Sequence, residues 1–341
     1  MRVITIKNWK EIGAVPKAFK DVKNILKKTY KAQDCIIDLE KGKFRAKRKL
    51  TKQLLDSAFS NEVFVIQYPV PVGKTLLSLA NKNRTILLIH DILGLRNQDE
   101  KLLAKEIKIL KHFPYIIVHN DKMKTFLIQK GIKSQHMYCL ELFDYLYEEE
   151  EEKKEKKREL IPRMKEEVTL CYAGSLLPEK SQFLYQMTED LLPFPIYLYG
   201  TGIDERQLNA KIRYEGNASP DELPHIMKGH LGLIWDGQWD EVDENKGFKN
   251  YTKYNTPHKL SCYLAAGIPV IVWEKSAIAE MVKRENIGYT IRTLEGIKNL
   301  NFQEYFVKKE RIKIFQQNVR SGYYTKRVME QIRKRMEEKN K

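Results

Sequence analysis

The sequence predicts an α/β protein made of two doubly wound, Rossmann-like domains. Three observations predict this class. The chain has 341 residues, which is more than one compact core of ordinary size holds. Short runs rich in Ile, Val and Leu alternate with longer segments whose apolar residues recur every three or four positions. A run of charged residues at 151–167 then divides this alternation into two series.

The first series forms the predicted N-terminal, acceptor-side domain, residues 1–150. Its strands are expected at 2–8, 35–39, 62–69, 84–91, 115–120 and 136–142. Helices are expected at 14–30, 98–113 and 122–130. Nearly continuous apolar strands separated by helices are typical of a parallel sheet covered on both faces. The start, MRVITIKNWK, lacks a long apolar stretch, so we interpret it as the first strand and not as a signal peptide.

The second series forms the predicted C-terminal, nucleotide-sugar-binding domain, residues 168–308. Its strands are expected at 168–174, 194–202, 211–217, 230–237, 268–273 and 288–291. We interpret 151–167 as an exposed linker because it has almost no apolar face. Residues 309–341 are predicted to form C-terminal helices that pack back toward the N-terminal domain. This arrangement suggests the GT-B architecture, in which ligands bind beyond the carboxyl ends of the strands, in an interdomain cleft.

Composition limits the partners and the compartment. The net charge of +16 favours anionic partners: sugar nucleotides, nucleic acid or an anionic membrane face. Cys35, Cys139, Cys171 and Cys262 show no CxxC spacing and lie in apolar runs, so we expect buried free thiols in a reducing cytoplasm. No window approaches the ~18 continuous apolar residues of a membrane span. We therefore expect a cytoplasmic protein, with a peripheral contact to a membrane left open.

The segment KYNTPHKLSCYLAAGIPVIVW, residues 253–273, carries the strongest chemical signal. Thr256 is predicted as the N-cap of a helix and Pro257 as its first residue. Lys259 then falls in the first turn, where a cation opposes the helix dipole unless an anion lies close by. Exposed N–H groups plus Lys259 therefore predict a diphosphate site. The alternatives are that Lys259 points to solvent and that His258 is a hydrogen-bonded structural histidine.

Two more segments of the second domain follow strands. In AGSLLPEK, 173–180, Gly174 allows a ligand to approach the backbone, Ser175 can hydrogen-bond oxygens, and Lys180 supplies a charge. In YLYGTG, 197–202, Tyr199 could stack on a base or ribose, and core packing is equally consistent with a strand tyrosine. The sequence contains neither GxGxxG here nor GxxxxGK[ST], which disfavours a nicotinamide cofactor and P-loop chemistry.

The first domain offers candidates for the acceptor side. Gly13 and Ala14 could open a helix at the cleft. His90 and Asp91 end a predicted strand, and a carboxylate at such a place is a reasonable general base for an acceptor hydroxyl. The alternative for Asp91 is that it caps the next segment. His119 is a similar group at the end of the following strand.

Several of these segments together resemble a known group of enzymes. They are YNTPHKLSCYLAAGIPVIVW, AGSLLPEKSQF, GLIWDG, QYPVP, IHDILGLR and FDYL. In this order they look like the bacterial glucosyltransferases that extend O-linked GlcNAc on serine-rich adhesins, and like related galactofuranosyltransferases. The resemblance covers roughly residues 1–335 and implies a GT-B fold. It also implies transfer from a UDP-sugar without a cofactor or bound metal.

The resemblance also implies roles for particular residues. Lys180 matches a basic residue near the UDP phosphates that is usually Arg, and Lys keeps the charge but loses the bidentate fork. Further positions that match the donor site of the family are Gly13, Ala14, Gly174, Ser175, Tyr199, Asn255, His258, Lys259, Ser276 and Ala277. Of these, the turn at Ser276 and Ala277 matches a loop that approaches the donor through backbone N–H groups.

One departure from retaining GT-B enzymes favours an inverting reaction. Those enzymes often carry a Glu-x7-Glu pair, and Tyr254 and Cys262 stand at the two places here. We therefore expect a base, Asp91, to deprotonate the acceptor hydroxyl, which then attacks the anomeric carbon. Lys259, acting with Lys180, would stabilise the leaving UDP electrostatically. The absence of a DxD triplet agrees with metal independence.

The leading hypothesis is a hexosyltransferase. It moves glucose, galactose or galactofuranose from a UDP-sugar to a hydroxyl of a glycan or glycoprotein acceptor, such as GlcNAc on protein or a growing surface polysaccharide. We expect a homo-oligomer. We expect no binding to nucleic acid, because the basic residues are dispersed and no nucleic-acid motif occurs. The alternatives are a UDP-sugar epimerase or hydrolase of the same fold, a basic nucleic-acid-binding protein, and an inactive partner subunit.

Overall fold

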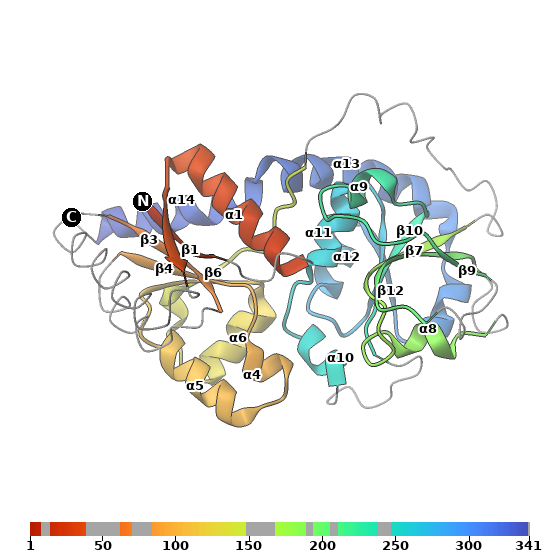
Figure 1. Cartoon of the computed structure of the whole chain (residues 1–341), viewed down its shortest axis with the longest axis horizontal. Coiled ribbons are helices and arrows are strands. Elements are labelled where there is room, and N and C mark those ends of the chain that lie inside the picture. The colour runs from red at the N-terminus through yellow and green to blue at the C-terminus, as the bar shows by residue number, and fades with distance from the viewer. Residues whose placement is uncertain are drawn as a thin grey trace. The chain divides into compact units, whose positions relative to one another are not determined.

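The chain folds into two compact units (Figure 1). The computed structural model describes residues 1–7, 14–38, 62–69, 84–147, 168–188, 194–204, 211–237 and 247–339. Unit 1 consists of Met1–Phe143 and Gly322–Lys341, and unit 2 is Asp144–Ser321. The predicted linker at 151–167 lies outside the described residues.

Unit 1 contains a six-stranded parallel sheet. Its strands are β1 (Arg2–Lys7), β2 (Gln33–Asp38), β3 (Phe64–Tyr68), β4 (Thr85–Ile89), β5 (Tyr115–Val118) and β6 (Met137–Cys139). Their order across the sheet is β2-β1-β3-β4-β5-β6, and every neighbouring pair is parallel. Each strand overlaps one that the apolar runs predicted. The described side chains of β3, β4 and β5 are all buried, which explains why these strands are uniformly apolar and do not alternate.

Helices complete unit 1. They are α1 (Ala14–Tyr30), α4 (Leu93–Arg96), α5 (Glu100–Leu110), α6 (Asp121–Gln129), the 3-10 turn η1 (Ser134–His136) and α14 (Tyr323–Glu338). Side chains define where two of them begin: Asp99 caps α5 by accepting from Leu102 N at 2.9 Å, and Asn120 caps α6 in the same way. Helix α14 packs against α1 and β6, so the last described helix belongs to unit 1.

Unit 2 contains the second six-stranded parallel sheet. Its strands are β7 (Leu170–Ser175), β8 (Ile196–Thr201), β9 (Ile212–Tyr214), β10 (Leu231–Ile234), β11 (Val270–Trp273) and β12 (Gly288–Ile291). Their order is β12-β11-β10-β7-β8-β9, the arrangement of a dinucleotide-binding fold. All six overlap predicted strands. The strand order reverses between β7 and β10, and ligands of such folds bind at the carboxyl ends of these two strands.

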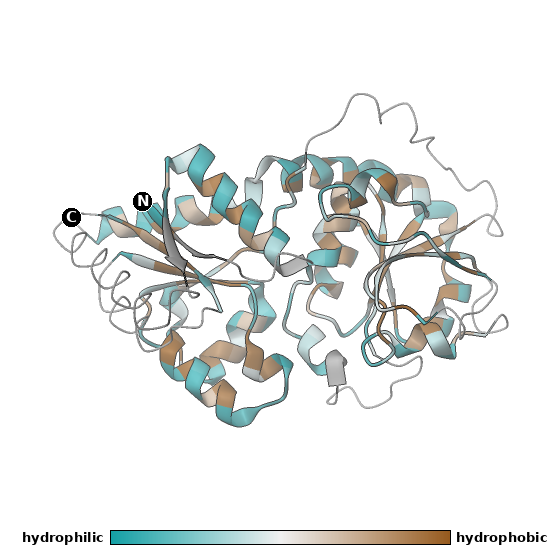
Figure 2. Cartoon of the chain, in the orientation of Figure 1, coloured by the Kyte–Doolittle hydropathy of each residue, from teal (hydrophilic) through white to brown (hydrophobic). Residues whose placement is uncertain are grey.

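The helices of unit 2 surround a core that apolar residues of the strands dominate (Figure 2). They are α8 (Gln182–Gln186), α9 (Leu223–Ile226), α10 (Gly247–Thr252), α11 (His258–Ala265), α12 (Ala279–Arg284), η4 (Leu294–Asn299), η5 (Phe302–Glu304) and α13 (Tyr305–Ser321). Helix α11 ends in a Schellman motif. Gly267 is left-handed there, at φ +72°, and Ile268 N donates to Tyr263 O at 2.9 Å.

Other predictions for the chain are met in part. Cys171 and Cys262 are buried free thiols, whereas Cys139 is only half-buried, and the side chain of Cys35 is not described. Across the described ranges, no helix combines the length and the apolar character that crossing a bilayer requires. The C-terminal helical region begins at Tyr305, a few residues before the predicted position, and Gly322 divides it into α13 and α14.

A side chain at Gly322 is poorly tolerated for two reasons. Its φ is +76°, and a Cβ built on it would lie 2.8 Å from Cγ1 of Ile25 in α1. We predict that Gly322→Ala destabilises unit 1 by about 1–3 kcal/mol, through left-handed strain and overpacking. The loss of stability is measured by thermal and urea unfolding monitored by circular dichroism. Gly296→Ala is the control, because its Cβ would meet atoms only at 3.5 Å. Equal stability of the two variants would contradict the prediction.

Candidate functional site

The site in unit 2 lies where β7 and β10 separate. These strands pair only through Leu231 with Leu170 and Gly232 with Cys171. Beyond that point Tyr263 of α11 fills the gap: its hydroxyl accepts from Ala173 N at 2.9 Å and donates to Leu233 O at 3.2 Å.

Gly232 makes this arrangement possible. A Cβ at this position would lie 2.5 Å from the ring of Tyr263, so only glycine leaves room for the ring. Burial raises the pKa of the Tyr263 hydroxyl well above its ordinary value, which keeps the hydroxyl neutral. Tyr263 therefore fixes α11 against the sheet at the point where the strand order reverses.

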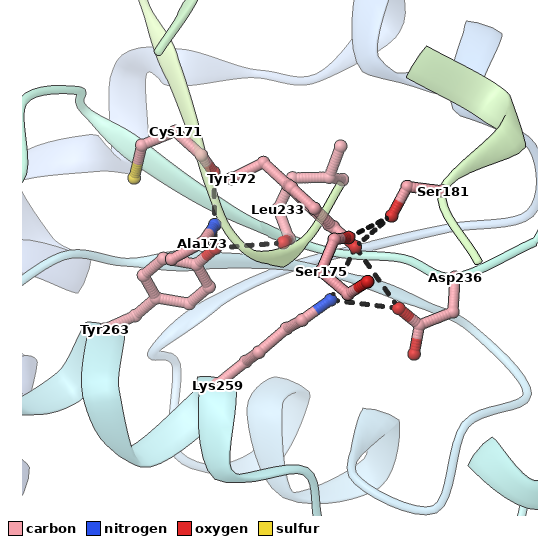
Figure 3. A network of polar contacts seen from close by, with 9 residues as sticks. All are labelled: Cys171, Tyr172, Ala173, Ser175, Ser181, Leu233, Asp236, Lys259 and Tyr263. Atoms are coloured by element: carbon pink, nitrogen blue, oxygen red, sulfur yellow. Dashed lines mark hydrogen bonds and ion pairs between the residues drawn. The ribbon is translucent and has the colours of Figure 1, made fainter. Parts of the chain in front are cut away.

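Lys259 lies one turn before Tyr263 on α11 and points toward β7 and β10 (Figure 3). Its Nζ donates to Tyr172 Oη at 2.8 Å and to Asp236 Oδ1 at 2.9 Å. The same Nζ lies 4.1 Å from the centre of the Tyr172 ring, within cation–π distance. The side chain is only 13% exposed. The alternative in which Lys259 points to solvent is therefore wrong.

A chain of hydroxyl groups continues from Lys259. Ser181 Oγ donates to Ser175 O at 2.6 Å, so its one hydrogen is already in use. Tyr172 Oη lies 2.8 Å from Ser181 Oγ and 3.3 Å from Asp236 Oδ1. Tyr172 must then donate to one of these two atoms while it accepts from Lys259. The network fixes both the position and the direction of the Lys259 ammonium group.

Three charged groups set the electrostatics of the site. Burial disfavours the charged form of Asp236, but the charges of Lys259 and Lys180 outweigh it and lower the pKa of this carboxyl. Burial, reinforced by the Asp236 charge, raises the pKa of Tyr172 well above its ordinary value. Two cations and one carboxylate thus share the site, and the surplus of positive charge favours an anionic ligand.

The loop after β7 brings Lys180 to this site. The loop is tied to the segment after β10, because Gly237 N donates to Lys180 O at 2.9 Å. Gly174, in the same strand-loop segment, leaves room for the Lys259 side chain, because a Cβ at position 174 would lie 2.8 Å from Cε of Lys259. The sequence predicted that Gly174 admits a ligand to the backbone. In the structure the group that approaches most closely is the lysine that would hold the ligand.

A small cavity opens beside Asp236. Its volume of about 20 Å³ is room for one water molecule. Asn255, Ser276 and Trp273 are among the residues that line it. Oδ1 of Asn255 is buried and has no hydrogen-bond partner within the described part of the chain. A buried acceptor of this kind needs a donor, and a hydroxyl group of a ligand can supply one.

Two details of the predicted donor site are corrected. The N-cap of α11 is Pro257, and the helix begins at His258, so Thr256 is not the cap. The backbone N–H groups of Ser276 and Ala277 are not directed to a ligand. Ser276 N donates to Trp273 O at 3.0 Å and Ala277 N donates to Thr252 O at 2.9 Å. Both hydrogens are thus used to hold the turn after β11.

Other predicted residues lie apart from the lysine network. The Tyr199 ring is buried in the core, and its hydroxyl accepts from Lys228 N at 2.8 Å, which supports the core-packing alternative. The ring of His258 lies 4.9 Å from that of Tyr145. Gly13 lies outside the described residues, and Ala14 is the first residue of α1.

Asp91 follows β4 in unit 1 and is 5% exposed. Its Oδ2 accepts from Arg96 Nη1 at 2.5 Å. Its Oδ1 is buried and, within the described ranges, has no hydrogen-bond partner. The N-cap of α4 is Ile92, without a side-chain bond, so the capping alternative for Asp91 is not realised. The carboxylate thus keeps one acceptor oxygen for another group.

Aromatic and imidazole rings surround the carboxyl ends of β3, β4 and β5. His90 stacks on Phe19 at 3.9 Å between ring centres, and its Nε2 lies 2.8 Å from Gln67 Oε1. His119 is 2% exposed, and its Nε2 lies 3.1 Å from Ile89 O. Because a carbonyl only accepts, this nitrogen carries the hydrogen. Burial lowers the pKa of His119 to about 4, so the ring is neutral at physiological pH.

Sequence reasoning missed several members of the lysine network, namely Tyr172, Ser181, Asp236 and Tyr263. Asp236 had a usable signal, since it directly follows the strand in GLIWDG. Tyr172 and Tyr263 had none, because each stands among apolar residues and looks like part of the core.

Two family models match the N-terminal and C-terminal parts of the chain. The model of the glucosyltransferase 3-like N-terminal domain matches residues 1–142, and that of the corresponding C-terminal domain matches 170–332. The chain belongs to the glucosyltransferase 3-like family. Membership confirms the resemblance that the motifs indicated, and it makes the protein a hexosyltransferase.

Individual relatives agree with this assignment. This glucosyltransferase 3-like chain is 30% identical to the β-1,6-galactofuranosyltransferase WbbI of Escherichia coli K12, over 74% of the chain and 72% of the relative. It is 27% identical to glucosyltransferase 3 of Streptococcus gordonii, over 72% and 70%. The crystal structure of Anabaena HepE in complex with UDP superposes with a TM-score of 0.59 at 14% identity, covering 99% of each chain. The predicted GT-B fold is thereby confirmed.

The buried neutral state of His119 predicts a pH dependence. The unfolded chain protonates this ring below 6.5, whereas the folded protein resists protonation until about 4. The contribution of His119 to the free energy of unfolding, about 3 kcal/mol, is therefore fully present above pH 6.5. It is lost as the pH drops toward 4. We predict that His119→Gln, which retains an N–H for Ile89 O, flattens the dependence in urea unfolding between pH 7 and 4. The exposed His112→Gln is the control, and an equal flattening there would refute the assignment.

Proposed function

We propose that the protein transfers a hexose from a UDP-sugar to a hydroxyl of a sugar acceptor. The acceptor class is GlcNAc on a glycoprotein or a growing surface polysaccharide, and the hexose is glucose, galactose or galactofuranose. The position of Lys259 carries this proposal. It places a nearly buried cation at the carboxyl ends of β7 and β10, where nucleotides bind in folds of this strand order. UDP bound to the structurally similar HepE supports the choice of nucleotide.

Lys259 retains donor capacity for a diphosphate. An ammonium group has three hydrogens, and within the described residues two of them go to Tyr172 and Asp236. The third can reach an oxygen of the diphosphate. Asp236 then acts as a positioning residue, because it holds the ammonium group in place before the ligand arrives. Lys180 adds a second cation whose charge acts at the same carboxylate.

The proposed reaction is an inverting displacement without a metal ion. The acceptor hydroxyl gives its proton to Asp91 Oδ1, and its oxygen forms a bond to the anomeric carbon. The bond from that carbon to the diphosphate breaks, and UDP leaves with the electron pair. Lys259 and Lys180 stabilise the charge that develops on UDP. The absence of carboxylates at Tyr254 and Cys262, the latter a buried thiol, supports inversion over retention.

The proposal is tested by incubating the protein with a panel of UDP-sugars and either GlcNAc-peptide or simple glycoside acceptors, read by mass spectrometry. We predict that Lys259→Ala lowers transfer roughly 100-fold, because the leaving group loses its nearest cation. Lys283→Ala, which removes an exposed lysine of α12, should leave transfer unchanged.

Three outcomes of this assay would overturn the proposal. Near-normal turnover by the Lys259 variant would remove the lysine from the mechanism. Inhibition by EDTA that manganese reverses would contradict metal independence. A changed or hydrolysed UDP-sugar formed without acceptor would indicate an epimerase or hydrolase.

Asp91 is tested separately. We predict that Asp91→Asn abolishes transfer while UDP affinity, measured by calorimetry, stays intact, because the amide cannot take the acceptor proton. Arg96→Gln removes the ion pair and leaves the carboxylate. If Asp91 served only to hold Arg96, both variants would lose the same activity, and that result would exclude Asp91 as the base.

A further inference from the structure

The segment FDYL, residues 143–146, is a sequence motif that the proposed transfer reaction does not use. Its tyrosine, Tyr145, belongs to unit 2 and is only 2% exposed. The backbone N–H of Tyr145 donates to Val319 O of α13 at 2.8 Å, which fixes the segment on that helix. A buried tyrosine normally gives its hydroxyl a hydrogen-bond partner, and that partner indicates what the residue holds in place.

The hydroxyl of Tyr145 is bonded to the turn that follows β9. It donates to Pro220 O at 2.6 Å. This turn also has bonds of its own, because Ser219 N donates to Glu222 Oε2 and Glu222 N donates to Ser219 Oγ, both at 3.2 Å. The shape of the turn is therefore set locally, and the bond from Tyr145 sets its position.

The ring of Tyr145 contacts the start of α11. Its centre lies 4.9 Å from that of His258, the first residue of the helix, and the two ring planes are tilted by 31°. The next residue is Lys259, whose ammonium group is held by Tyr172 and Asp236. Those two bonds fix the end of the lysine side chain and not the backbone of its helical turn. Tyr145 contacts that turn directly.

The two segments that Tyr145 joins lie at the same edge of the sheet. Pro220 follows β9, and Lys259 in the first turn of α11 reaches Asp236, which follows β10. Nucleotides bind at this carboxyl edge in folds of this strand order. Helices α9 and α11 also pack against each other. Beside the turn there is open space, since a Cβ built on Gly216 would meet no atom of the described residues within 4 Å.

We propose that Tyr145 is a positioning residue of the donor site: it fixes the spacing between the turn at Pro220 and the first turn of α11, which border the bound UDP. The inference rests on the proposed function, because it assigns Tyr145 to the UDP site of that reaction. Tyr145 acts through these two segments and does not take part in the chemical step. The free donor and the transition state need the same spacing, so loss of the bond weakens donor binding and leaves kcat nearly unchanged.

The test compares Tyr145→Phe with the parent protein by calorimetric titration with UDP and by kinetics at varied UDP-sugar concentration. We predict that UDP binds roughly 3- to 10-fold more weakly, the usual effect of one hydrogen bond. KM for the UDP-sugar should rise by a similar factor, while kcat stays within about twofold. A role confined to folding would lower the free energy of unfolding in urea without changing the UDP affinity of the folded protein.

Tyr147→Phe is the matched control from the same segment. The hydroxyl of Tyr147 donates to Ala265 O, at the other end of α11, at 2.9 Å. Its ring centre also lies near that of a histidine, His225, at 4.6 Å. In the variant, Ala265 O keeps a second donor, Gln316 Nε2 at 2.9 Å. The UDP affinity of Tyr147→Phe should equal that of the parent protein.

Two results would overturn the inference. One is an unchanged UDP affinity in Tyr145→Phe. The other is an equal loss of UDP affinity in Tyr145→Phe and Tyr147→Phe, which would show that the place of the bond on α11 does not matter. Failure of the proposed function has a different signature, because the parent protein itself would then not bind UDP, and the inference would fall with it.

Discussion

The parting of β7 from β10 is the constraint on which the unit 2 site depends. Two parallel strands that stop pairing leave backbone groups without partners, and a buried N–H or C=O in that state is costly. The hydroxyl of Tyr263 hydrogen-bonds to a backbone group of each strand, Ala173 N of β7 and Leu233 O of β10. Because α11 is held by this residue, Lys259 one turn earlier enters the opening between the strands. The position of the cation is thus a result of how the sheet is completed.

A carboxylate next to the lysine of the proposed diphosphate site looks unfavourable, yet it orders the lysine side chain. Asp236 lowers the net charge of the site, but with Tyr172 it fixes where the ammonium group points. A flexible lysine would lose side-chain entropy when it closes on a ligand. Here most of that loss has already occurred during folding. Fixed cations of this kind stabilise a developing charge without having to reorganise first.

The sequence alone predicts the strands well and the site only in outline. All twelve strands overlap predicted runs, since buried parallel strands are apolar along most of their length. Lys259 was identified because a cation in a first helical turn needs an explanation. Asp236 and Tyr172 depend on which strands are neighbours, and the sequence does not state that β10 lies beside β7. Tyr199 shows the converse: a polar strand end attracted a functional interpretation although its hydroxyl serves the backbone.

Unit 2 is one continuous segment, whereas unit 1 combines segments from before and after it. During synthesis on the ribosome, unit 2 therefore has all its strands while unit 1 still waits for α14. Until α14 is synthesised, α1 lacks the helix that packs against it, whose buried residues include Val328, Met329 and Ile332. Nascent chains that expose apolar surface in this way are targets for chaperones and prone to aggregate. The half of the molecule that is translated first is thus the half that matures last.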